Sequence, residues 1–495
     1  MIAHHLPILQ IIVPLIAAPL SAIFRRPALA WYFAIIVCAV TFAISIALLG
    51  RVIDGGHISY ALGGWAPPWG IEYRVDAVNA FVLVIISAIG LAVLPYARVS
   101  VAHEIEPHNQ ALFYTAYLLC LTGILGMVIT GDAFNAFVFL EISSLSTYVL
   151  VALGANRDRR ALTAAYSYLV MGTIGATFFV IGVGLIYMMT GTLNMADLAA
   201  RLQGLEQNRT VLVAFGFIVT GLGLKLALFP LHLWLPNAYA FAPSAVTVFL
   251  AATATKAALY LLIRFMFTVF GTDYHILALT LTWLFTPLAL AAIFASSTVA
   301  IFQVDIKRML AYSSVAQIGY MLLGLSFASV AGLTATMLHV FNHALMKGAL
   351  FMTLGAIVLR KGVASIESVR GLGYKMPWTM AAFVVGGLSL IGVPLTVGFI
   401  SKWYLVSASL QSGRWPIAAL ILASSLLAVI YVWRVIEAAY LEKAIDDAPV
   451  AEAPLSMLIP TWTLIGANVY FGIDAGLTTK AAGEAAQILL GVVVP

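Results

Sequence analysis

Five charged residues lie inside long apolar runs of this 495-residue sequence, where charge is unexpected. On an insertion scale, each charge at the centre of a membrane-spanning helix costs ~2.5–3.5 kcal/mol, so five together cost roughly 12–18 kcal/mol. If these runs span a membrane, a cost of that size indicates a role in moving ions or protons. The five residues are Glu141, Lys225, Lys256, Lys347 and Lys402.

Glu141 and Lys225 have the chemistry of a switchable ion pair. When they are close, each favours the charged form of the other, and when they separate in lipid, burial favours both neutral forms. A buried lysine that can release its proton is a relay station. Two alternatives stay open: Glu141 could be a static partner, and Lys225 or Lys402 could extend to the membrane interface.

Two histidines share a helix face with Lys347. His339, His343 and Lys347 follow one another at four-residue spacing, so they line one face over about 12 Å. The row favours a proton wire that ends in the lysine, while hydrogen-bonded core histidines are the alternative. A zinc site lacks a third ligand nearby. For His232, which follows Pro230, structural and functional roles are equally compatible with the sequence.

The composition places the whole chain in lipid. Charged residues make up 9% and hydrophobic residues 63%, with a mean hydropathy of +1.04, whereas soluble domains are about 25% charged. This excludes a cytoplasmic enzyme, a secreted disulfide scaffold and a nucleic-acid binder. Cys38 and Cys120 both lie in apolar runs, so we expect no disulfide or metal framework. The sequence leaves no room for a large domain outside the membrane, so we also expect no bound cofactor.

Apolar runs of about 20 residues predict an all-α polytopic membrane protein with about fourteen transmembrane helices. Short alternating segments, which would indicate a barrel, are absent. The first run is expected to be a retained helix, because it lacks the basic start of a cleaved signal peptide. The spans are expected near residues 6–24, 31–50, 77–96, 111–130, 133–153, 163–190, 210–235, 244–270, 276–298, 309–328, 331–359, 378–410, 415–440 and 455–475.

Two segments are interrupted in the same way. Prolines break residues 210–243 around Lys225, and Pro394 breaks residues 378–410 eight residues before Lys402. Proline removes a backbone donor and kinks a helix, and lipid permits freed backbone groups only where they line a cavity. One interrupted segment in each half is typical of transporters built from inverted repeats.

Lysine and arginine set the expected orientation. They are more frequent in the connections on one side of the membrane, which predicts that both termini lie outside an inner (plasma) membrane. Asp305, Lys307 and Arg308 stand at an expected helix start on the inner side. Capping and the positive-inside rule account for these three residues.

Five motifs then show a resemblance to a known family. In order, they are VFLEISSLSTYVL, GLKLALFPLHLWLPNAYAFAPSA, VDIKRMLAYSSVAQIGYM, LHVFNHALMKGALFMTLG and GVPLTVGFISKWYL. Over roughly residues 70–435 the chain resembles the antiporter-like proton-translocating subunits. These are the D-type subunits of Mrp monovalent cation/proton antiporters and the related pumping subunits of respiratory complex I and membrane-bound hydrogenases.

The resemblance implies a fourteen-helix fold that contains two inverted five-helix repeats, each with one broken helix. The implied division is 1–110 for helices 1–3, 111–270 for the first repeat, 271–440 for the second, and 441–495 for a C-terminal helix and tail. The motifs assign roles in a proton translocation axis to Glu141 on helix 5, Lys225 on the first broken helix, Lys256 on helix 8, His339, His343 and Lys347 on helix 11, and Lys402 on the second broken helix.

The length and the lysine set resemble the Mrp D type most. The chain is not expected to have the long lateral helix of the largest complex I subunit. Lys402 also stands where some complex I members carry Glu. We therefore expect a transporter subunit that moves protons, with Na⁺ as the exchanged ion, within an assembly of other membrane subunits. The alternative is a pumping subunit of respiratory complex I (an NADH-quinone oxidoreductase) or of a hydrogenase. A non-conducting structural subunit would gain nothing from the desolvation cost of the charged axis.

Overall fold

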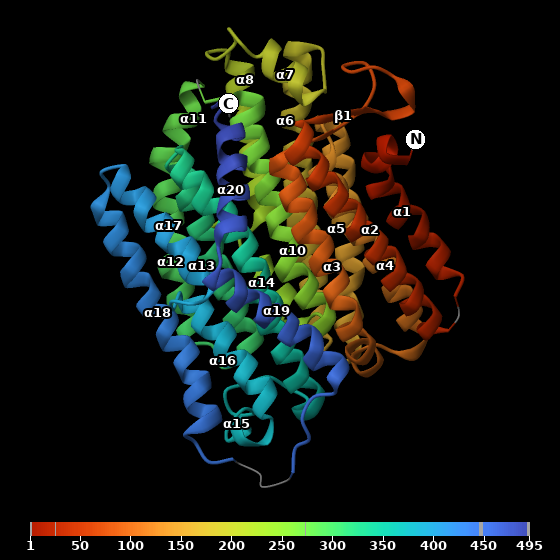
Figure 1. The fold of residues 1–495 in the computed structure, drawn as a ribbon, viewed down its shortest axis with the longest axis vertical. Coiled ribbons are helices and arrows are strands. Elements are labelled where there is room, and N and C mark those ends of the chain that lie inside the picture. The colour runs from red at the N-terminus through yellow and green to blue at the C-terminus, as the bar shows by residue number, and fades with distance from the viewer. Residues whose placement is uncertain (1, 25, 273, 445–448, 493–495) are drawn as a thin grey trace.

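The computed structural model describes residues 2–24, 26–272, 274–444 and 449–492. Most of this part of the chain is helical, as the sequence predicts, and the helices pack side by side in one bundle (Figure 1). The helices are α1 (Leu6–Ala22), α2 (Pro27–Gly55), α3 (Ala77–Glu104), α4 (Gln110–Ile129), α5 (Ala133–Ala152), α6 (Arg160–Thr190), α7 (Met195–Arg201), α8 (Arg209–Leu226), α9 (Trp234–Phe241), α10 (Ser244–Ile263), α11 (His275–Leu279), α12 (Thr286–Ile301), α13 (Ile306–Ser326), α14 (Val330–Lys361), α15 (Leu372–Lys375), α16 (Pro377–Ile391), α17 (Val397–Gln411), α18 (Trp415–Tyr440), α19 (Leu455–Ile473) and α20 (Gly476–Leu489).

Shorter turns extend or join these helices. Two of them are π-helical and flank the connection between α10 and α12, namely η5 (Arg264–Phe270) and η6 (Thr280–Phe285). The others are short 3₁₀ turns: η1 (Ile2–His5), η2 (Leu62–Gly64), η3 (Pro107–Asn109) and η4 (Leu153–Asn156).

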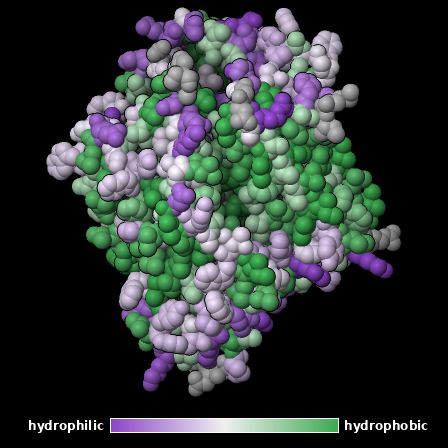
Figure 2. All heavy atoms as spheres, viewed as in Figure 1, coloured by the Kyte–Doolittle hydropathy of each residue, from purple (hydrophilic) through white to green (hydrophobic). Residues whose placement is uncertain are grey.

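Twelve helices in the described part of the chain are long and apolar enough to cross a membrane. Two further segments, α16–α17 and α19–α20, are each built from two helices. The first and last described residues lie at the same end of the bundle (Figure 1). On the face shown in Figure 2, hydrophobic residues predominate over the middle of the bundle, and hydrophilic residues gather at the two ends of the bundle. The chain is therefore an all-α polytopic membrane protein, and the number of crossings, about fourteen, stays a prediction.

Several helices, among them α3, α5, α8, α13 and α14, begin at a residue whose side chain accepts from their first free N–H groups. At the start of α3, Asp76 Oδ1 accepts from the backbone N–H of Val78 (3.0 Å) and Asn79 (3.1 Å). Asn79 Oδ1 in turn accepts from the Asp76 N–H at 2.8 Å. This reciprocal capping box fixes the point where α3 begins.

Two features of the termini-bearing end were not expected from the sequence. A short hairpin, β1 (Ile58–Ala61) and β2 (Glu72–Val75), precedes α3. The hairpin binds two later connections of the chain. The Glu72 carbonyl accepts from the Gly131 N–H between α4 and α5 at 2.8 Å, and Glu72 Oε2 accepts from the Asn194 side chain before α7 at 2.7 Å. The second feature is α20, which packs against α3 and α14. A search for apolar runs does not detect α20 because the helix contains polar residues. Among them are Lys480 and Glu484, whose charged groups lie 3.9 Å apart.

The centre of the bundle is formed by α10, α13 and α14, which are the most enclosed of the long helices, whereas α1, α2, α6 and α18 lie at the periphery. Lys256 belongs to α10 and Lys347 to α14. The two lysines are therefore held on the most enclosed part of the scaffold, which gives their side chains little freedom to reach water.

Candidate functional site

The two expected interruptions are present, and each ends on a left-handed residue. Helix α8 stops after Lys225 at Leu226, and Ala227 has φ 60°. Helix α16 stops at Ile391, and Gly392 has φ 94°. The breaks free backbone carbonyls inside the bundle, where they can bind polar side chains because the surrounding protein shields them from lipid.

Glu141 and Lys225 lie together, as their chemistry suggests. Lys225 Nζ is 3.9 Å from Glu141 Oε1 and donates a hydrogen bond to Ser144 Oγ, one turn further along α5. The two ends of the pair differ in exposure, since the Lys225 side chain is 6% exposed and that of Glu141 is 25% exposed. The ammonium thus stands inside the bundle, and the Glu141 side chain is partly exposed at its edge, although the Oε1 oxygen that faces Lys225 is buried.

A small cavity connects this pair with the central helices. It has a volume of about 20 Å³ and is lined by Ser144 and Thr147 of α5, Lys225 of α8, and Ala254 and Ala258 of α10, among others. A cavity of this size with several polar partners can hold about one water molecule. Ala254 and Ala258 share one face of α10, whereas Lys256, two residues from each, points away from that face, so the cavity adjoins Lys225 and the helix that carries Lys256.

Lys256 and Lys347 are fully enclosed. Lys256 Nζ donates to the Ala251 carbonyl of its own helix. Lys347 Nζ donates to the Leu310 carbonyl of α13 at 2.8 Å and to Ser313 Oγ. Neutral groups therefore accept these hydrogen bonds from both ammonium groups. Neutral acceptors can bind a lysine in either protonation state, which an ionic partner would oppose.

The histidines of α14 divide into one with partners and one without. His339 Nδ1 is 2.8 Å from Ser401 Oγ, and His339 Nε2 is 3.0 Å from Gln317 Oε1. The His343 ring is parallel to it at 6.1 Å, and within the described residues neither His343 nitrogen has a partner. Buried polar groups are normally hydrogen-bonded, so His343 is the group in this row that most needs water.

Lys402 lies at the second break. Its Nζ donates to the carbonyls of Ile391 (2.7 Å) and Leu390 (3.3 Å), both freed where α16 ends, and to Ser425 Oγ at 3.0 Å. It also lies 5.0 Å from the centre of the Tyr320 ring. Ser401, the residue before it, contacts His339, so the histidines of α14 and Lys402 are neighbours.

His232 lies in the non-helical stretch between α8 and α9. Its ring stacks on Phe229 at 5.1 Å and is buried, with 7% exposure. Its Nδ1 has no hydrogen-bond partner among the described residues. The stacking accounts for its position, and neither this contact nor the burial joins it to the lysines.

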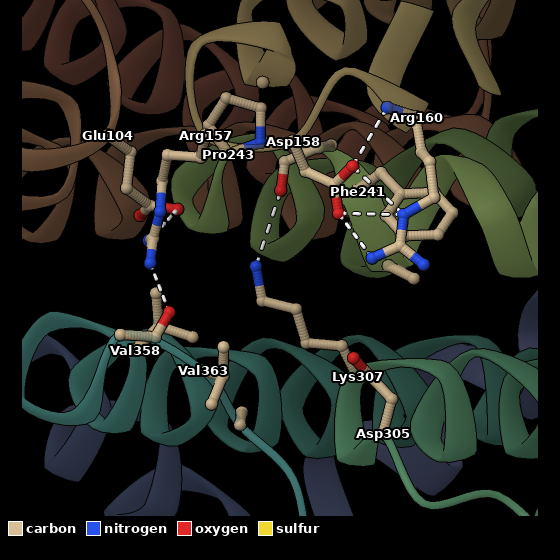
Figure 3. Close-up of a pocket in the computed structure, with 15 residues that line it drawn as sticks. Glu104, Arg157, Asp158, Arg160, Phe241, Pro243, Asp305, Lys307, Val358 and Val363 are labelled. Carbon is tan, nitrogen blue, oxygen red and sulfur yellow. Dashed lines mark hydrogen bonds and ion pairs between the residues drawn. The ribbon is translucent and has the colours of Figure 1, made fainter. Parts of the chain in front are cut away.

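The sequence did not indicate a charged cavity at the end of the bundle opposite the termini. It has a volume of about 170 Å³, and it is shown in Figure 3 with Lys307 and Asp305 on one side and Glu104, Arg157 and Arg160 on the other. Asp305 does cap α13, since its Oδ1 accepts from the Arg308 N–H at 2.8 Å. Lys307, however, is only 6% exposed. The positive-inside rule alone therefore does not explain Lys307.

Glu104 forms one wall of this charged cavity. Its Oε1 accepts from Ser100 Oγ (2.7 Å), and its Oε2 accepts from the N–H and the hydroxyl of Ser244 (3.0 and 3.1 Å). Arg157 lies 3.4 Å from the same carboxylate. At the rim, the hydrogen bond from Arg160 lowers the pKa of the Asp158 carboxyl. The cavity thus carries charges of both signs.

Comparisons with known proteins agree on one family. Residues 130–428 match the family described as NADH:quinone oxidoreductase/Mrp antiporter, transmembrane. The chain is 43% identical over 478 residues to the N-type subunit of the NADH-quinone oxidoreductase of Desulforudis audaxviator, covering 93% of this chain and 94% of that one. It is 29% identical to the D-type subunit of the Na(+)/H(+) antiporter of Bacillus subtilis, covering 98% and 97%.

Solved structures give the same picture. The Mrp complex from Dietzia sp. contains a chain that superposes with a TM-score of 0.90 at 26% identity, covering 99% of this chain and 98% of that one. A chain of the membrane-bound sulfane sulfur reductase, an archaeal respiratory membrane complex, superposes with a TM-score of 0.89 at 30% identity and the same coverage. Both neighbours are chains of larger membrane complexes.

Proposed function

Because the chain belongs to the NADH:quinone oxidoreductase/Mrp antiporter family, we propose that it is the proton-translocating subunit of a multi-subunit Na⁺/proton antiporter. The observation that carries the proposal is the set of four buried lysines, Lys225, Lys256, Lys347 and Lys402, on four different helices. An ammonium group at membrane depth is costly, and proton transport is a function that would account for the cost of four of them. Relatives named as D-type subunits of Na(+)/H(+) antiporters support the choice of ion.

The proposed proton axis runs from Glu141 through Lys225 and Lys256 to the row of Lys347, His343 and His339 on α14, and then to Lys402, which lies beside His339. Ammonium groups in a medium of low dielectric repel one another strongly. A proton that arrives on one lysine therefore favours proton release from the next. Glu141 acts as the anchor for Lys225, since their 3.9 Å separation allows the ammonium to move toward or away from the carboxylate.

Lys402 is suited to release protons. Its hydrogen-bond partners among the described residues are carbonyls and a hydroxyl, so no ionic partner holds its charge. Lys225 has a carboxylate beside it and is suited to act as the switch. The two broken helices would then have different roles.

The protein functions in an assembly with other membrane subunits. Glu141 is one-quarter exposed on the side of the bundle, at a depth where a carboxylate that faces lipid is strongly unfavourable. A neighbouring subunit would cover this carboxylate. The solved structures that resemble this chain come from such assemblies.

We further propose an inner (plasma) membrane location with both termini outside, which places the charged cavity at the inner face. The division into residues 1–110, 111–270, 271–440 and 441–495, with two inverted repeats in the middle, fits the two broken helices α8–α9 and α16–α17.

A complex I-type pumping subunit is the second candidate. The relative with 43% identity is named as the N-type subunit of an NADH-quinone oxidoreductase, whereas the antiporter relatives are 28–30% identical. In that setting the same axis would be driven by redox chemistry in other subunits. Neighbouring genes for small Mrp-type subunits, or for quinone-reductase or hydrogenase subunits, distinguish the two settings.

The test is transport by the purified assembly in vesicles that carry a pH-sensitive dye. An antiporter should change the internal pH when a Na⁺ gradient is imposed, without any electron donor. The second candidate would be correct if the internal pH changes only when an electron donor and quinone are present and does not depend on the Na⁺ gradient.

A further inference from the structure

Lys225 has more hydrogen-bond donors than the groups around it accept. An ammonium group carries three N–H donors, and within the described residues Lys225 Nζ donates one hydrogen bond, to Ser144 Oγ. Glu141 Oε1 lies 3.9 Å from Nζ, and this buried oxygen has no hydrogen-bond partner among the same residues. The ammonium group is therefore near the carboxylate without being bound to it, and it has donors left for another acceptor.

Tyr148 supplies a second unused acceptor on the same helix. Its side chain is buried, and its hydroxyl has no hydrogen-bond partner in the part of the chain that the structure describes. The hydroxyls of Ser144 and Thr173 lie close to it, but neither is placed to bind it. Glu141, Ser144 and Tyr148 follow at spacings of three and four residues, so they share one face of α5. Helical side chains lean toward the N-terminus, so the Tyr148 ring extends back toward Ser144.

Gly172 of α6 brings the Tyr148 hydroxyl and the Lys225 ammonium group to one place. A Cβ on this glycine would lie 2.4 Å from the Tyr148 hydroxyl oxygen and 3.4 Å from Lys225 Nζ. Both polar atoms therefore border the same small space, which glycine leaves open. Lysine has a flexible four-carbon stem, so a change in its side-chain torsions can carry Nζ across this space to the hydroxyl.

The Tyr148 ring is held in place by other aromatic side chains. It meets the Tyr168 ring edge-on at 5.0 Å, and Tyr168 stacks on Trp234 at 4.4 Å. Trp234 Nε1 donates to the Leu224 carbonyl at 3.0 Å, one residue before Lys225. Contacts from α6 and α9 thus hold the Tyr148 hydroxyl beside the break in α8, while the lysine side chain is the part that can move.

The same aromatic contacts border the small cavity next to α10. Tyr168 and Lys225 both line this cavity, together with Ala254 and Ala258 of α10, whereas Glu141 is not one of its lining residues. A lysine that is bound to the Tyr148 hydroxyl would have left the carboxylate and would still lie beside the cavity, which has room for about one water molecule. Such a water is a suitable proton acceptor for the lysine.

We propose that the Tyr148 hydroxyl is the second hydrogen-bond partner of Lys225 and receives the lysine side chain when it leaves Glu141. A phenolic hydroxyl both accepts and donates hydrogen bonds, so it can bind the lysine as an ammonium or as an amine. The carboxylate favours the ammonium form alone. Tyr148 is thus a positioning residue that makes the proton on Lys225 easier to release. This inference rests on the proposed proton transport.

Tyr148→Phe removes the hydroxyl and keeps the ring against Tyr168. Na⁺-driven proton movement by the purified complex should fall at least fivefold. Its pH dependence should also move toward alkaline pH, by roughly half a unit to one unit for one neutral hydrogen bond, because a lysine that stays beside Glu141 releases its proton only at higher pH. The other titratable groups around Tyr148 and its neighbour Tyr168, which the variant leaves in place, are Cys120 of α4 and Tyr239 of α9.

Gly172→Ala tests the same contact from the opposite helix. Its new methyl group would displace the Tyr148 hydroxyl, so transport should fall as it does in Tyr148→Phe. When Tyr148→Phe has already removed the hydroxyl, Gly172→Ala should have a smaller additional effect. Gly184→Ala is the matched control on α6, because a Cβ there would meet no neighbouring atom of the described residues within 4 Å.

Melting temperatures of the assembled complexes test the contact without any transport. Tyr148→Phe, Lys225→Met and the double variant form a cycle. Because each substitution removes the same contact, the second should lower the melting temperature less in the presence of the first than it does alone. Independent, additive losses would count against the contact.

Two transport results would overturn the proposal. One is wild-type transport with an unchanged pH dependence in assembled Tyr148→Phe, and the other is equal transport by Gly172→Ala and Gly184→Ala. If Tyr148→Phe does not assemble, the two glycine variants decide. If the wild-type complex moves no protons under a Na⁺ gradient, the proposed function has failed instead, and the melting-temperature cycle then decides whether Tyr148 binds Lys225.

Discussion

Lys402→Arg tests whether the second broken helix releases protons. Within the described residues, Lys402 donates hydrogen bonds to three neutral acceptors, at 2.7, 3.0 and 3.3 Å, so no counter-ion offsets the difference between the two side chains. An unperturbed arginine holds its proton roughly 2–3 pKa units more tightly than an unperturbed lysine. That difference is about 3–4 kcal/mol. If release from position 402 limits turnover, exchange should fall about 100- to 1,000-fold.

The assay is Na⁺-driven proton movement by purified complexes across a pH series, beside Lys402→Met and the control Lys480→Arg. Lys480 is three-quarters exposed on α20, so its replacement should leave transport unchanged. Assembly is checked in parallel, because the Lys402 side chain packs closely against Gly392. Wild-type exchange by an assembled Lys402→Arg complex at any pH would show that position 402 needs only positive charge, and the reasoning would be wrong.

Three further predictions concern single positions. Glu141→Ala should abolish exchange in vesicles while the complex still assembles, and Glu141→Asp should keep part of it because the charge survives with a shorter reach; normal exchange by Glu141→Ala would remove Glu141 from the axis. Lys347→Ala should stop transport, whereas His343→Gln should only slow it; equal loss of expression in both would show that this helix face is structural. Gly392→Ala should lower transport several-fold, because its left-handed φ of 94° disfavours a side chain by about 1–2 kcal/mol and the new Cβ would lie 2.9 Å from Lys402 Cδ; unchanged transport and melting temperature would contradict this.

The sequence was sufficient to predict the features that follow from desolvation cost and backbone chemistry. Lys225 and Lys402 were expected at interrupted helices because proline and glycine break the apolar runs around them, and both lie beside such breaks. The spacing of His339, His343 and Lys347 fixes their common face on α14. The pairing of Glu141 with Lys225 required tertiary structure, although their opposite charges suggested it.

Other features depend on contacts between distant segments, which one sequence does not reveal. Glu104 and Lys307 each stand at the end of a helix, where a charge is ordinary, and only folding brings them to one cavity. Tyr96 looks like any aromatic residue in an apolar helix until Gly355 is placed against it. Helix α20 escaped detection because its polar residues are tolerated beside α3 and α14.

The most direct test of the proton axis is the flux of protons through complexes that carry Lys256→Ala. Lys256 is fully enclosed on the central helix α10, and within the described residues its one hydrogen bond is to the Ala251 carbonyl of the same helix, so its proposed role is proton transfer. Proton flux under a Na⁺ gradient should fall at least 100-fold in assembled Lys256→Ala complexes and stay at the wild-type level in Lys480→Ala. Equal flux in the two variants would contradict the account.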